Sequence, residues 1–287
     1  NVVSSGGVPG ASTNVVLRSM TSISGSNQPL YIIDGVPMNN SSFDPTTISD
    51  VFETTTGLAS RYIDYSSRGN DLDPDNIESM TILKGAAAAA LYGSEASNGA
   101  IIITTKKGSQ GKGRVQYANS FGWSKAYGYP DMQDKYANGA YGATNWYYTS
   151  RMGAPYEAGT KLYDNIAAVL QTGFAQMHNV SVEGGSEQVT MRAAVKWQNS
   201  KGVVKTTAND RLNLTLSGKA EVTKWLNFDA SFQYTNQKTD KALKGTSGPL
   251  YLAMRWPMID DMSNYMDPDG IQMRLPNYYV DTDLLNP

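Results

Sequence analysis

The sequence of 287 residues contains no cysteine and a single histidine, His178. The lack of cysteine excludes disulfide bonds, cysteine-ligated zinc and a cysteine nucleophile. A histidine-rich metal site is excluded as well, and a Ser–His–Asp triad would have to be built on His178 alone. We expect a solvated or strand-end position for this residue, and we predict neither a metal nor another cofactor for the chain.

The sequence also lacks a strong charge of one sign and a long apolar run. The formal net charge is −2, so no electrostatic footprint for nucleic acid is present. No apolar run reaches the ~18–20 residues that a membrane-spanning helix needs, and the first ten residues do not form a signal peptide. Strands of a β-barrel remain compatible with these absences, because alternating residues escape a search for apolar runs.

Up to about Gly113 the sequence predicts a small α+β domain. A run of alanine between Ala86 and Leu91 predicts a short helix that ends at Gly93. The phosphate-loop patterns GxxxxGK[ST] and GxGxxG are absent there, so we interpret this helix as a packing element that lies close to a sheet. The strand-like runs of this domain are Asn14–Arg18, Leu30–Asp34, Ser79–Leu83 and Ala100–Thr105.

The stretch DLDPDNIE, Asp71 to Glu78, is similar to the start of a calcium loop. Its three aspartates occupy positions one, three and five, but position six is Asn76 instead of glycine and position twelve is not glutamate. The pattern therefore excludes an EF-hand. It predicts instead that Asp73 caps a short helix whose first residue is Pro74.

Beyond Gly113 apolar and polar residues alternate with a period of two, which is typical of strands with one apolar and one polar face. We predict five strands from this alternation. They cover Val115–Trp123, Asn179–Glu183, Val189–Trp197, Leu212–Ser217 and Leu226–Tyr234.

Three features of these strands favour a membrane barrel over a soluble sandwich. A strand of ~10 residues tilted by roughly 40° rises about 25 Å, which is the height of an outer-membrane apolar band. Tight turns at Gly184–Glu187 and Thr223–Trp225 contrast with a very long link between the first two strands. Aromatic residues occur near the strand ends, at Trp123, Trp197, Trp225 and Tyr234. The residues alone leave both folds open, and five strands could form only the beginning of a barrel.

The long link Lys125–Thr172 is rich in tyrosine and tryptophan. Amphipathic rings suit the recognition of sugars, peptides or a protein partner. The alternative is that they pack the segment against itself. A helix is also predicted over residues 162–170, with Gly173 as its C-cap. The candidates for contact with a substrate or a protein lid are Trp146, Tyr147, Tyr148 and Tyr141.

Taken together, these features resemble the SusC/RagA family of TonB-dependent outer-membrane transporters. Two segments are similar to the plug signature of that family, SISGSNQPLYIIDGVP (Ser22–Pro37) and DLDPDNIESMTILKGAAAAALYGSEASNGAIIITTKKG (Asp71–Gly108). A third, TGFAQMHNVSVEGGSE (Thr172–Glu187), is similar to its first barrel hairpin. The family usually has Arg-Gly near the start of the plug, whereas this sequence has Arg18 followed by serine.

The resemblance implies an α+β plug domain in residues 1–113, without its amino-terminal part. Residues 114–287 would then form about five antiparallel transmembrane strands, with long external loops, as a fragment of a 22-stranded barrel. Val195, Leu214 and Phe228 would face outer-membrane lipid. Each of these residues is followed in the chain by one that would face the lumen or the plug, namely Lys196, Thr215 and Asp229.

The resemblance further implies TonB-dependent import of glycans or oligopeptides through the outer membrane, with a SusD-like surface lipoprotein as the lid. It implies no enzymatic activity. A soluble β-rich carbohydrate-binding protein is the alternative. A glycoside hydrolase would need two carboxylates ~5–9.5 Å apart, and the acidic residues of the signature, Asp34, Glu78 and Glu95, each have a turn or capping explanation.

Overall fold

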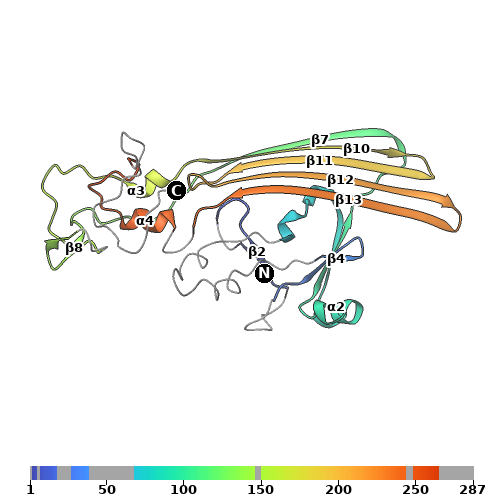
Figure 1. Ribbon diagram of the computed structural model, residues 1–287, viewed down its shortest axis with the longest axis horizontal. Helices are drawn as coiled ribbons and strands as arrows, with labels where there is room; N and C mark the ends of the chain where they lie inside the picture. Colours follow the sequence, from blue (N-terminus) through green and yellow to red (C-terminus); the bar gives the residue numbers. More distant parts are fainter. Residues whose placement is uncertain are drawn as a thin grey trace, which may run out of the picture.

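The chain, seen in a computed structural model, is built around two main β-sheets of different size (Figure 1). A long five-stranded sheet, which we call the wall, runs along one side. A four-stranded sheet with the helix α2 (Gly85–Tyr92), which we call the plug, lies against the inner face of the wall. The residues that the structure describes are 2–4, 7–17, 27–38, 68–145, 150–243 and 248–264.

Each strand of the wall pairs with the next one along the sheet in an antiparallel ladder. All five strands predicted from the alternation are present, and each is longer than predicted, with 13 to 16 residues. The ladder continues through polar residues beyond the alternating core, which is why the pattern underestimated the strand lengths. The strands are β7 (Gly111–Ser124), β10 (Gly173–Gly185), β11 (Val189–Lys201), β12 (Ala208–Thr223) and β13 (Leu226–Asp240).

The register separates the two faces of the wall as predicted. Val180, Val195 and Leu214 stand in one row across β10, β11 and β12, and the side chain of Val195 is 45% exposed on the outer face. The inner face carries Lys196 and Thr215, which are only 8% and 3% exposed because the plug covers them. Asp229, on the same inner face of β13, pairs with Lys107 of the segment that follows the plug.

The two ends of the wall differ in the length of their connections. At one end the strands are joined by residues 186–188 and 224–225 only, and we call it the short-turn end. At the other end, which we call the loop end, residues 125–172 and 202–207 join the strands, and the chain leaves β13. Short and long connections thus gather at opposite ends, a distribution that is typical of outer-membrane barrels.

The plug sheet has the strand order β4-β3-β6-β5, with β3 parallel to β6 and both outer pairs antiparallel. Asp34 lies in the turn between β3 and β4, and its carboxylate accepts hydrogen bonds from the backbone N–H and the hydroxyl of Thr105 at 2.9 and 2.6 Å. Asp34 therefore lies in a turn, as predicted, and its carboxylate has a structural role. The strands are β3 (Leu30–Ile33), β4 (Val36–Met38), β5 (Ile77–Leu83) and β6 (Ala100–Thr105), and a separate pair is formed by β1 (Val2–Ser4) and β2 (Thr13–Val15).

The alanine helix α2 packs on one face of the plug sheet, as predicted. Ala88 is fully buried against Ile32, Ala96 and Ala100. The helix ends at Gly93, whose φ of 77° lies in the left-handed region that favours glycine. A side chain of one carbon at Ala88 lets the helix approach the sheet closely.

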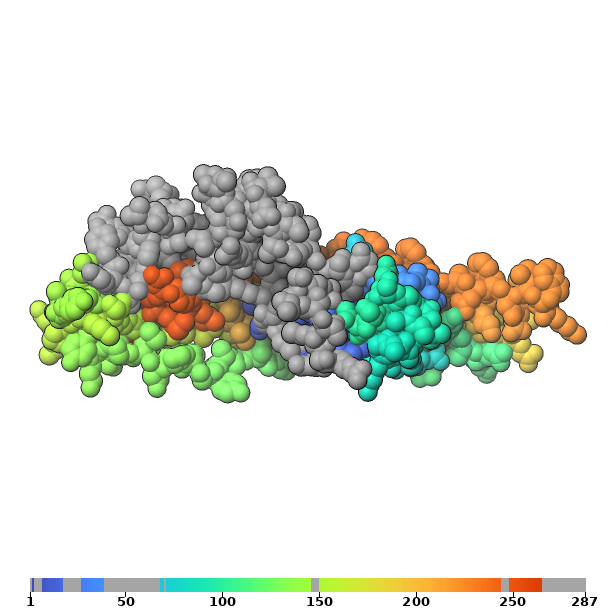
Figure 2. Space-filling model, turned by 90° about the horizontal axis from the view of Figure 1, so that it is seen from below, coloured from blue at the N-terminus to red at the C-terminus, as the bar shows by residue number. Residues whose placement is uncertain are grey.

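The loop end carries a compact unit, which we call the outer module. It contains β8 (Gly139–Ala140), β9 (Ala143–Thr144), α3 (Asn165–Val169) and α4 (Pro249–Arg255). Figures 1 and 2 place residues 125–172 and α4 side by side at this end, away from α2. An apolar core joins the two segments, and its buried members are Ile166, Val169, Leu252, Ala253, Trp256 and Met262.

The helix predicted over residues 162–170 is present only in part. It is shortened to α3, which Asp164 caps through a hydrogen bond from the N–H of Ala167 at 3.0 Å. The assignment of Gly173 as its C-cap is wrong, because Leu170 already leaves the helix to form a β-bridge with Val204.

Two aromatic predictions also differ from the structure. His178 is not at a strand end, and its side chain is half-buried. It lies within β10, with its ring between those of Tyr117 and Trp197 and a 2.7 Å hydrogen bond to the Tyr117 hydroxyl. Tyr234 lies inside β13 and not near its end. Both strands extend further than the alternation indicated, which moves these residues inward.

Candidate functional site

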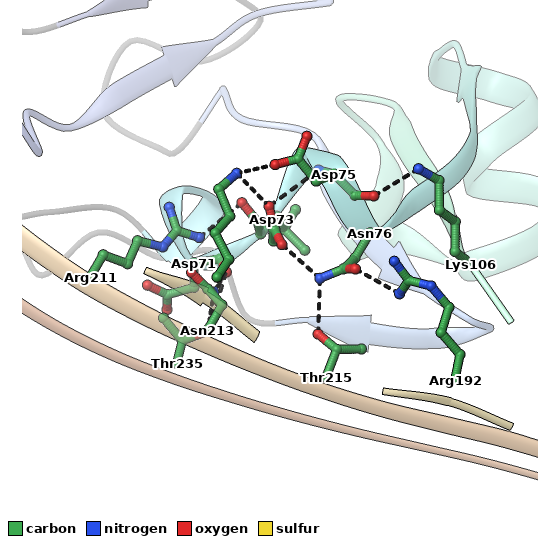
Figure 3. Close-up of polar contacts among 12 residues, drawn as sticks. Asp71, Asp73, Asp75, Asn76, Lys106, Arg192, Arg211, Asn213, Thr215 and Thr235 are labelled. Atoms are coloured by element: carbon green, nitrogen blue, oxygen red, sulfur yellow. Dashed lines mark hydrogen bonds and ion pairs between the residues drawn. The ribbon is translucent and has the colours of Figure 1, made fainter. Parts of the chain in front are cut away.

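The contact between plug and wall is built on the aspartate-rich stretch of the plug. This stretch forms two short 3₁₀ helices, Arg68–Asp71 and Pro74–Asn76. Asp73 caps the second helix by accepting a hydrogen bond from the Asp75 N–H at 3.2 Å, and Pro74 is its first residue, as predicted. The tight turns direct several polar side chains toward the wall (Figure 3).

Lys196 of β11 is held between two of these carboxylates. Its Nζ lies 2.8 Å from Asp73 Oδ1 and 2.6 Å from Asp75 Oδ2. Asp73 and Lys196 are buried, so this pair is shielded from water and from salt. A buried charge left without its partner is strongly destabilising, and the two groups therefore depend on each other.

Asn76 makes the second contact with the wall, and all of its described partners are polar groups. Its amide nitrogen donates to Asp73 Oδ2 at 2.6 Å and to the Thr215 hydroxyl at 3.1 Å. Its amide oxygen accepts a hydrogen bond from the Arg192 guanidinium at 2.7 Å. Arg192 is buried and also lies 3.8 Å from Glu183 on the neighbouring strand. Three strands of the wall are thereby connected to one plug side chain.

Asp71 makes the third contact, chiefly through its backbone. Its carbonyl oxygen accepts hydrogen bonds from Asn213 and Thr235 at 3.4 Å each, and the Arg211 guanidinium donates to the carbonyl of the next residue, Leu72, at 2.9 Å. Burial raises the pKa of the Asp71 carboxyl, although the positive charges of Arg211 and Arg68 act in the opposite direction.

The segment that leads from the plug to the first wall strand is attached to the same inner face. The Lys106 ammonium donates to the Asp75 carbonyl at 2.8 Å, and the Lys106 carbonyl accepts from the Ser217 hydroxyl at 3.2 Å. Lys107 forms an ion pair with Asp229 of β13. Together with the aspartate-rich stretch, these contacts form what we call the plug–wall anchor.

The chemistry of the anchor suits attachment. Its carboxylates are neutralised by wall cations and its amides are hydrogen-bonded, so the plug is held by groups that can be exchanged for water when it moves. Among the described residues, no group of three or more His, Asp or Glu side chains is arranged to hold a metal ion. Sequence reasoning found the cap at Asp73 but missed its wall partners, because pairing between residues more than 100 positions apart leaves no local signal.

Of the four residues predicted to contact a substrate or a lid, the structure describes only Tyr141, in the outer module. Tyr141 lies in the turn between β8 and β9, where it is fully exposed and has a φ of 53°. The other three candidates, Trp146, Tyr147 and Tyr148, lie outside the described residues. A cavity of 210 Å³ opens nearby in the module between Tyr129 and Tyr163.

Several side chains fasten the outer module. Arg151 donates to the carbonyls of Met254 and Trp256 at 2.8 and 3.2 Å, and the buried Asn165 makes three further contacts. Asn165 at the start of α3 donates to the carbonyls of Pro257 and Asp260 at 3.1 and 3.0 Å, and its oxygen accepts from the Met262 N–H at 3.0 Å. Two segments almost 100 residues apart in the chain thus behave as one unit.

No helix within the described part of the chain is both long and apolar enough to cross a membrane.

Comparison with known proteins gives matches for the plug and for the chain as a whole. Residues 1–100 match the family model described as the TonB-dependent receptor plug domain. The chain is 30% identical over 274 residues to TonB-dependent receptor SusC of Bacteroides thetaiotaomicron, a match that covers 94% of this chain and 25% of that protein. It is 27% identical over 285 residues to TonB-dependent receptor P26 of Formosa agariphila, with 94% and 25% covered.

Solved structures show the same fold. The RagAB peptide importer in its closed-closed state matches 99% of this chain and 32% of its own, with a TM-score of 0.63 and 20% identity. A second structure, described as the RagAB peptide transporter, gives a TM-score of 0.62 at the same identity and coverage. The chain spans about a quarter of the length of the curated relatives that it matches.

Proposed function

Since this chain belongs to the SusC/RagA family of TonB-dependent outer-membrane receptors, we propose that it forms the plug and the first wall strands of a nutrient importer. In this proposal residues 1–113 are the plug domain and residues 114–287 begin the barrel. The importer is located in the outer membrane, is driven by the TonB complex and has no catalytic activity of its own.

The observation that carries the proposal is the plug–wall anchor. An importer needs a plug that is attached firmly at rest and can be released when substrate has bound. The anchor offers a buried ion pair between Asp73 and Lys196 and hydrogen bonds from Asn76 to the inner face of the wall. Polar contacts of this kind support a reversible attachment, because water can replace them during release.

The two ends of the wall support an orientation. Outer-membrane barrels have short turns on the periplasmic side and long loops outside the cell. We therefore assign the short-turn end, with residues 186–188 and 224–225, to the periplasm. The outer module then lies outside, where a SusD-like lipoprotein would cover it.

For the substrate we propose glycans or oligopeptides, captured with the help of exposed aromatic residues of the outer module. Tyr141 is fully exposed, and Trp146, Tyr147 and Tyr148 follow it closely in the chain. Tyrosine and tryptophan lose little conformational entropy on binding and offer both an apolar ring and a polar group. The RagAB structures are described as a peptide importer, which supports the oligopeptide alternative for this fold.

The proposal is tested by uptake and topology in cells. Replacement of Trp146, Tyr147 and Tyr148 together by alanine should reduce substrate uptake or lid association while the protein still assembles in the outer membrane. Deletion of TonB should abolish uptake in the unchanged protein. Since the chain has no cysteine, Asn145→Cys should react with a membrane-impermeant maleimide on intact cells, and Lys224→Cys should react only after the periplasm is opened.

Labelling of Lys224→Cys and not of Asn145→Cys on intact cells would overturn the orientation. Recovery of the protein in the soluble fraction, with retained carbohydrate binding, would support the soluble binding protein instead. Normal uptake and normal lid association by the triple variant would leave the aromatic segment with a packing role only.

A further inference from the structure

The outer face of the wall is hollowed near the short-turn end. A cavity of 720 Å³ opens there across β10 to β13 and is lined almost entirely by apolar atoms. Its floor is one row of the sheet, in which Gly184 pairs with Met191, Met191 with Gly218 and Gly218 with Ala230.

Met191 is the one large side chain within this row and is 66% exposed, and further large side chains border the row on β12 and β13. Phe232 and Phe228 flank Ala230 two residues away along β13, and they are 54% and 61% exposed. Leu216, which pairs with Phe232, extends the border onto β12. Because side chains on one face of a strand are two residues apart, small residues between two phenylalanines leave a groove between the rings.

Within the part of the chain that the structure describes, neither the backbone conformation nor a close contact requires glycine at position 218. Its backbone lies outside the left-handed region, and pairing with β11 and β13 continues through it without a bulge. A Cβ at this position would meet only the Thr190 carbonyl at 3.6 Å and Met191 Cγ at 4.0 Å, which are ordinary contacts. Gly184 differs, since a Cβ there would lie 3.0 Å from the Gly113 Cα.

Glycine inside a strand weakens it, and its presence marks a bulge, a bend or the close approach of another group. The register excludes a bulge at Gly218, and the described groups nearest to it, the Thr190 carbonyl and Met191 Cγ, are only at ordinary van der Waals distances from a Cβ built there. The lack of a side chain at Gly218 therefore leaves room for a group from outside the described residues.

We propose that this hollow binds an acyl chain of a phospholipid whose phosphate meets Lys224. The proposal rests on the proposed function, because it requires the outer face of the wall to lie in a membrane. An apolar groove suits an acyl chain, whereas a sugar or a peptide backbone would leave its polar groups unpaired.

The position of Lys224 relative to the hollow fits a phospholipid. Lys224 and Trp225 form the exposed turn between β12 and β13, and Trp225 is 82% exposed. Gly218 is six residues from Lys224, which corresponds to about 20 Å along the strand and about 15 Å along the membrane normal at a tilt of roughly 40°. That depth is about one leaflet of a hydrocarbon core ~30 Å thick. Tryptophan and lysine at the head-group level are typical of membrane proteins.

The test uses the complete receptor, purified from outer membranes and stripped of lipid in detergent. Native mass spectrometry would then follow the binding of phosphatidylglycerol and phosphatidylethanolamine added to the micelles. Gly218→Leu fills the hollow and should abolish retention of one phospholipid. Val195→Leu, which adds bulk to the same outer face beyond the hollow, should leave retention unchanged. Lys224→Gln should weaken phosphatidylglycerol binding about fivefold and phosphatidylethanolamine binding less.

Equal phospholipid binding by the unchanged receptor and by Gly218→Leu would overturn the proposal. A loss of receptor dimers instead of lipid would overturn it too, because the occupant would then be a second copy. Lipid binding is measured by native mass spectrometry and import by cellular uptake. Each of the two proposals can therefore be contradicted without the other. A receptor that binds the lipid but imports nothing contradicts the importer alone, and one that imports but shows no lipid difference contradicts the hollow alone.

Discussion

At the scale of single residues, the plug–wall anchor depends on two charged groups that have lost their hydration and are paired with each other. Asp73 is 7% exposed and Lys196 is 8% exposed, so neither can regain full hydration while the plug stays in place. The net stabilisation by such a pair is small, since desolvation opposes the attraction, but removal of one partner leaves the other charge buried and unpaired.

Lys196→Met should therefore destabilise the attachment of the plug by ~3–5 kcal/mol. The measurement is the urea concentration at which the plug becomes accessible to protease in the purified receptor. Lys219→Met is the matched control. Lys219 pairs with Glu221 on the exposed part of β12, and exposed pairs contribute about 0–1 kcal/mol. A similar urea shift for both variants would show that the buried pair has no special role.

Asp71 gives the anchor a pH dependence in which stability rises as the pH falls. Burial raises the pKa of its carboxyl in the folded protein, so the ionised form is disfavoured by folding. This penalty is fully present above the raised pKa and disappears as the pH falls below the ordinary value for aspartate. Asp71→Asn should thus stabilise the plug at neutral pH, and the difference from the unchanged protein should vanish in acid.

Urea unfolding of both proteins across this pH range measures the difference directly. Asn213 and Thr235 bond to the backbone carbonyl of Asp71, so the substitution leaves those contacts in place. A stabilisation that is independent of pH would contradict the assignment to the carboxyl.

At the scale of elements, α2 shows how a helix of small side chains is used. Of its five alanines, Ala88 is buried against the sheet, and Ala86, Ala87 and Ala90 are exposed. The alanine run was expected to act in packing, and the structure assigns this role to the face that carries Ala88. The exposed alanines contribute helix propensity.

Ala88→Leu should destabilise the plug by about 1–3 kcal/mol, because a filled interior cannot accept three more heavy atoms without movement. Ala87→Leu, on the exposed side of the same helix, should change the free energy of unfolding by less than ~0.5 kcal/mol. Chemical denaturation followed by circular dichroism measures both. Equal effects of the two substitutions would mean that the helix does not pack in the way described.

At the scale of the whole molecule, the structure brings together segments that are distant in the chain. The plug and the segment that follows it are attached to β11, β12 and β13, which come more than 70 residues later in the chain. At the loop end, residues 125–172 and 248–264 share one apolar core and the side chain of Asn165.

Asn165→Ala should open the outer module, because it leaves two buried carbonyls and one N–H without their partner, at a cost of ~1–3 kcal/mol for each group. Hydrogen exchange in α4 should rise at least tenfold, while exchange in β11 and β12 stays as it was. Ala167→Ser, on the exposed side of α3, is the control. Unchanged exchange in α4 would show that the apolar core and the Arg151 hydrogen bonds to Met254 and Trp256 hold the two segments together without Asn165.

Most elements of the wall and the plug could be predicted from local sequence patterns. Alternation identified all five wall strands and the assignment of Val195 and Lys196 to opposite faces, because a half-buried strand repeats every two residues. Alanine propensity and Gly93 identified α2, and the Asp73-Pro74 pair identified a cap. Each of these depends on residues that are neighbours in the chain.

The contacts between these elements could not be predicted in the same way. The partners of Asp73 and Asn76 lie more than 100 residues away, and the local pattern explained Asp73 fully as a cap. The same holds for His178, which an aromatic cluster from two other strands surrounds, and for Gly218, whose neighbours across the sheet create the hollow. Register and docking fix such contacts, and a one-residue slip in either would change all of them.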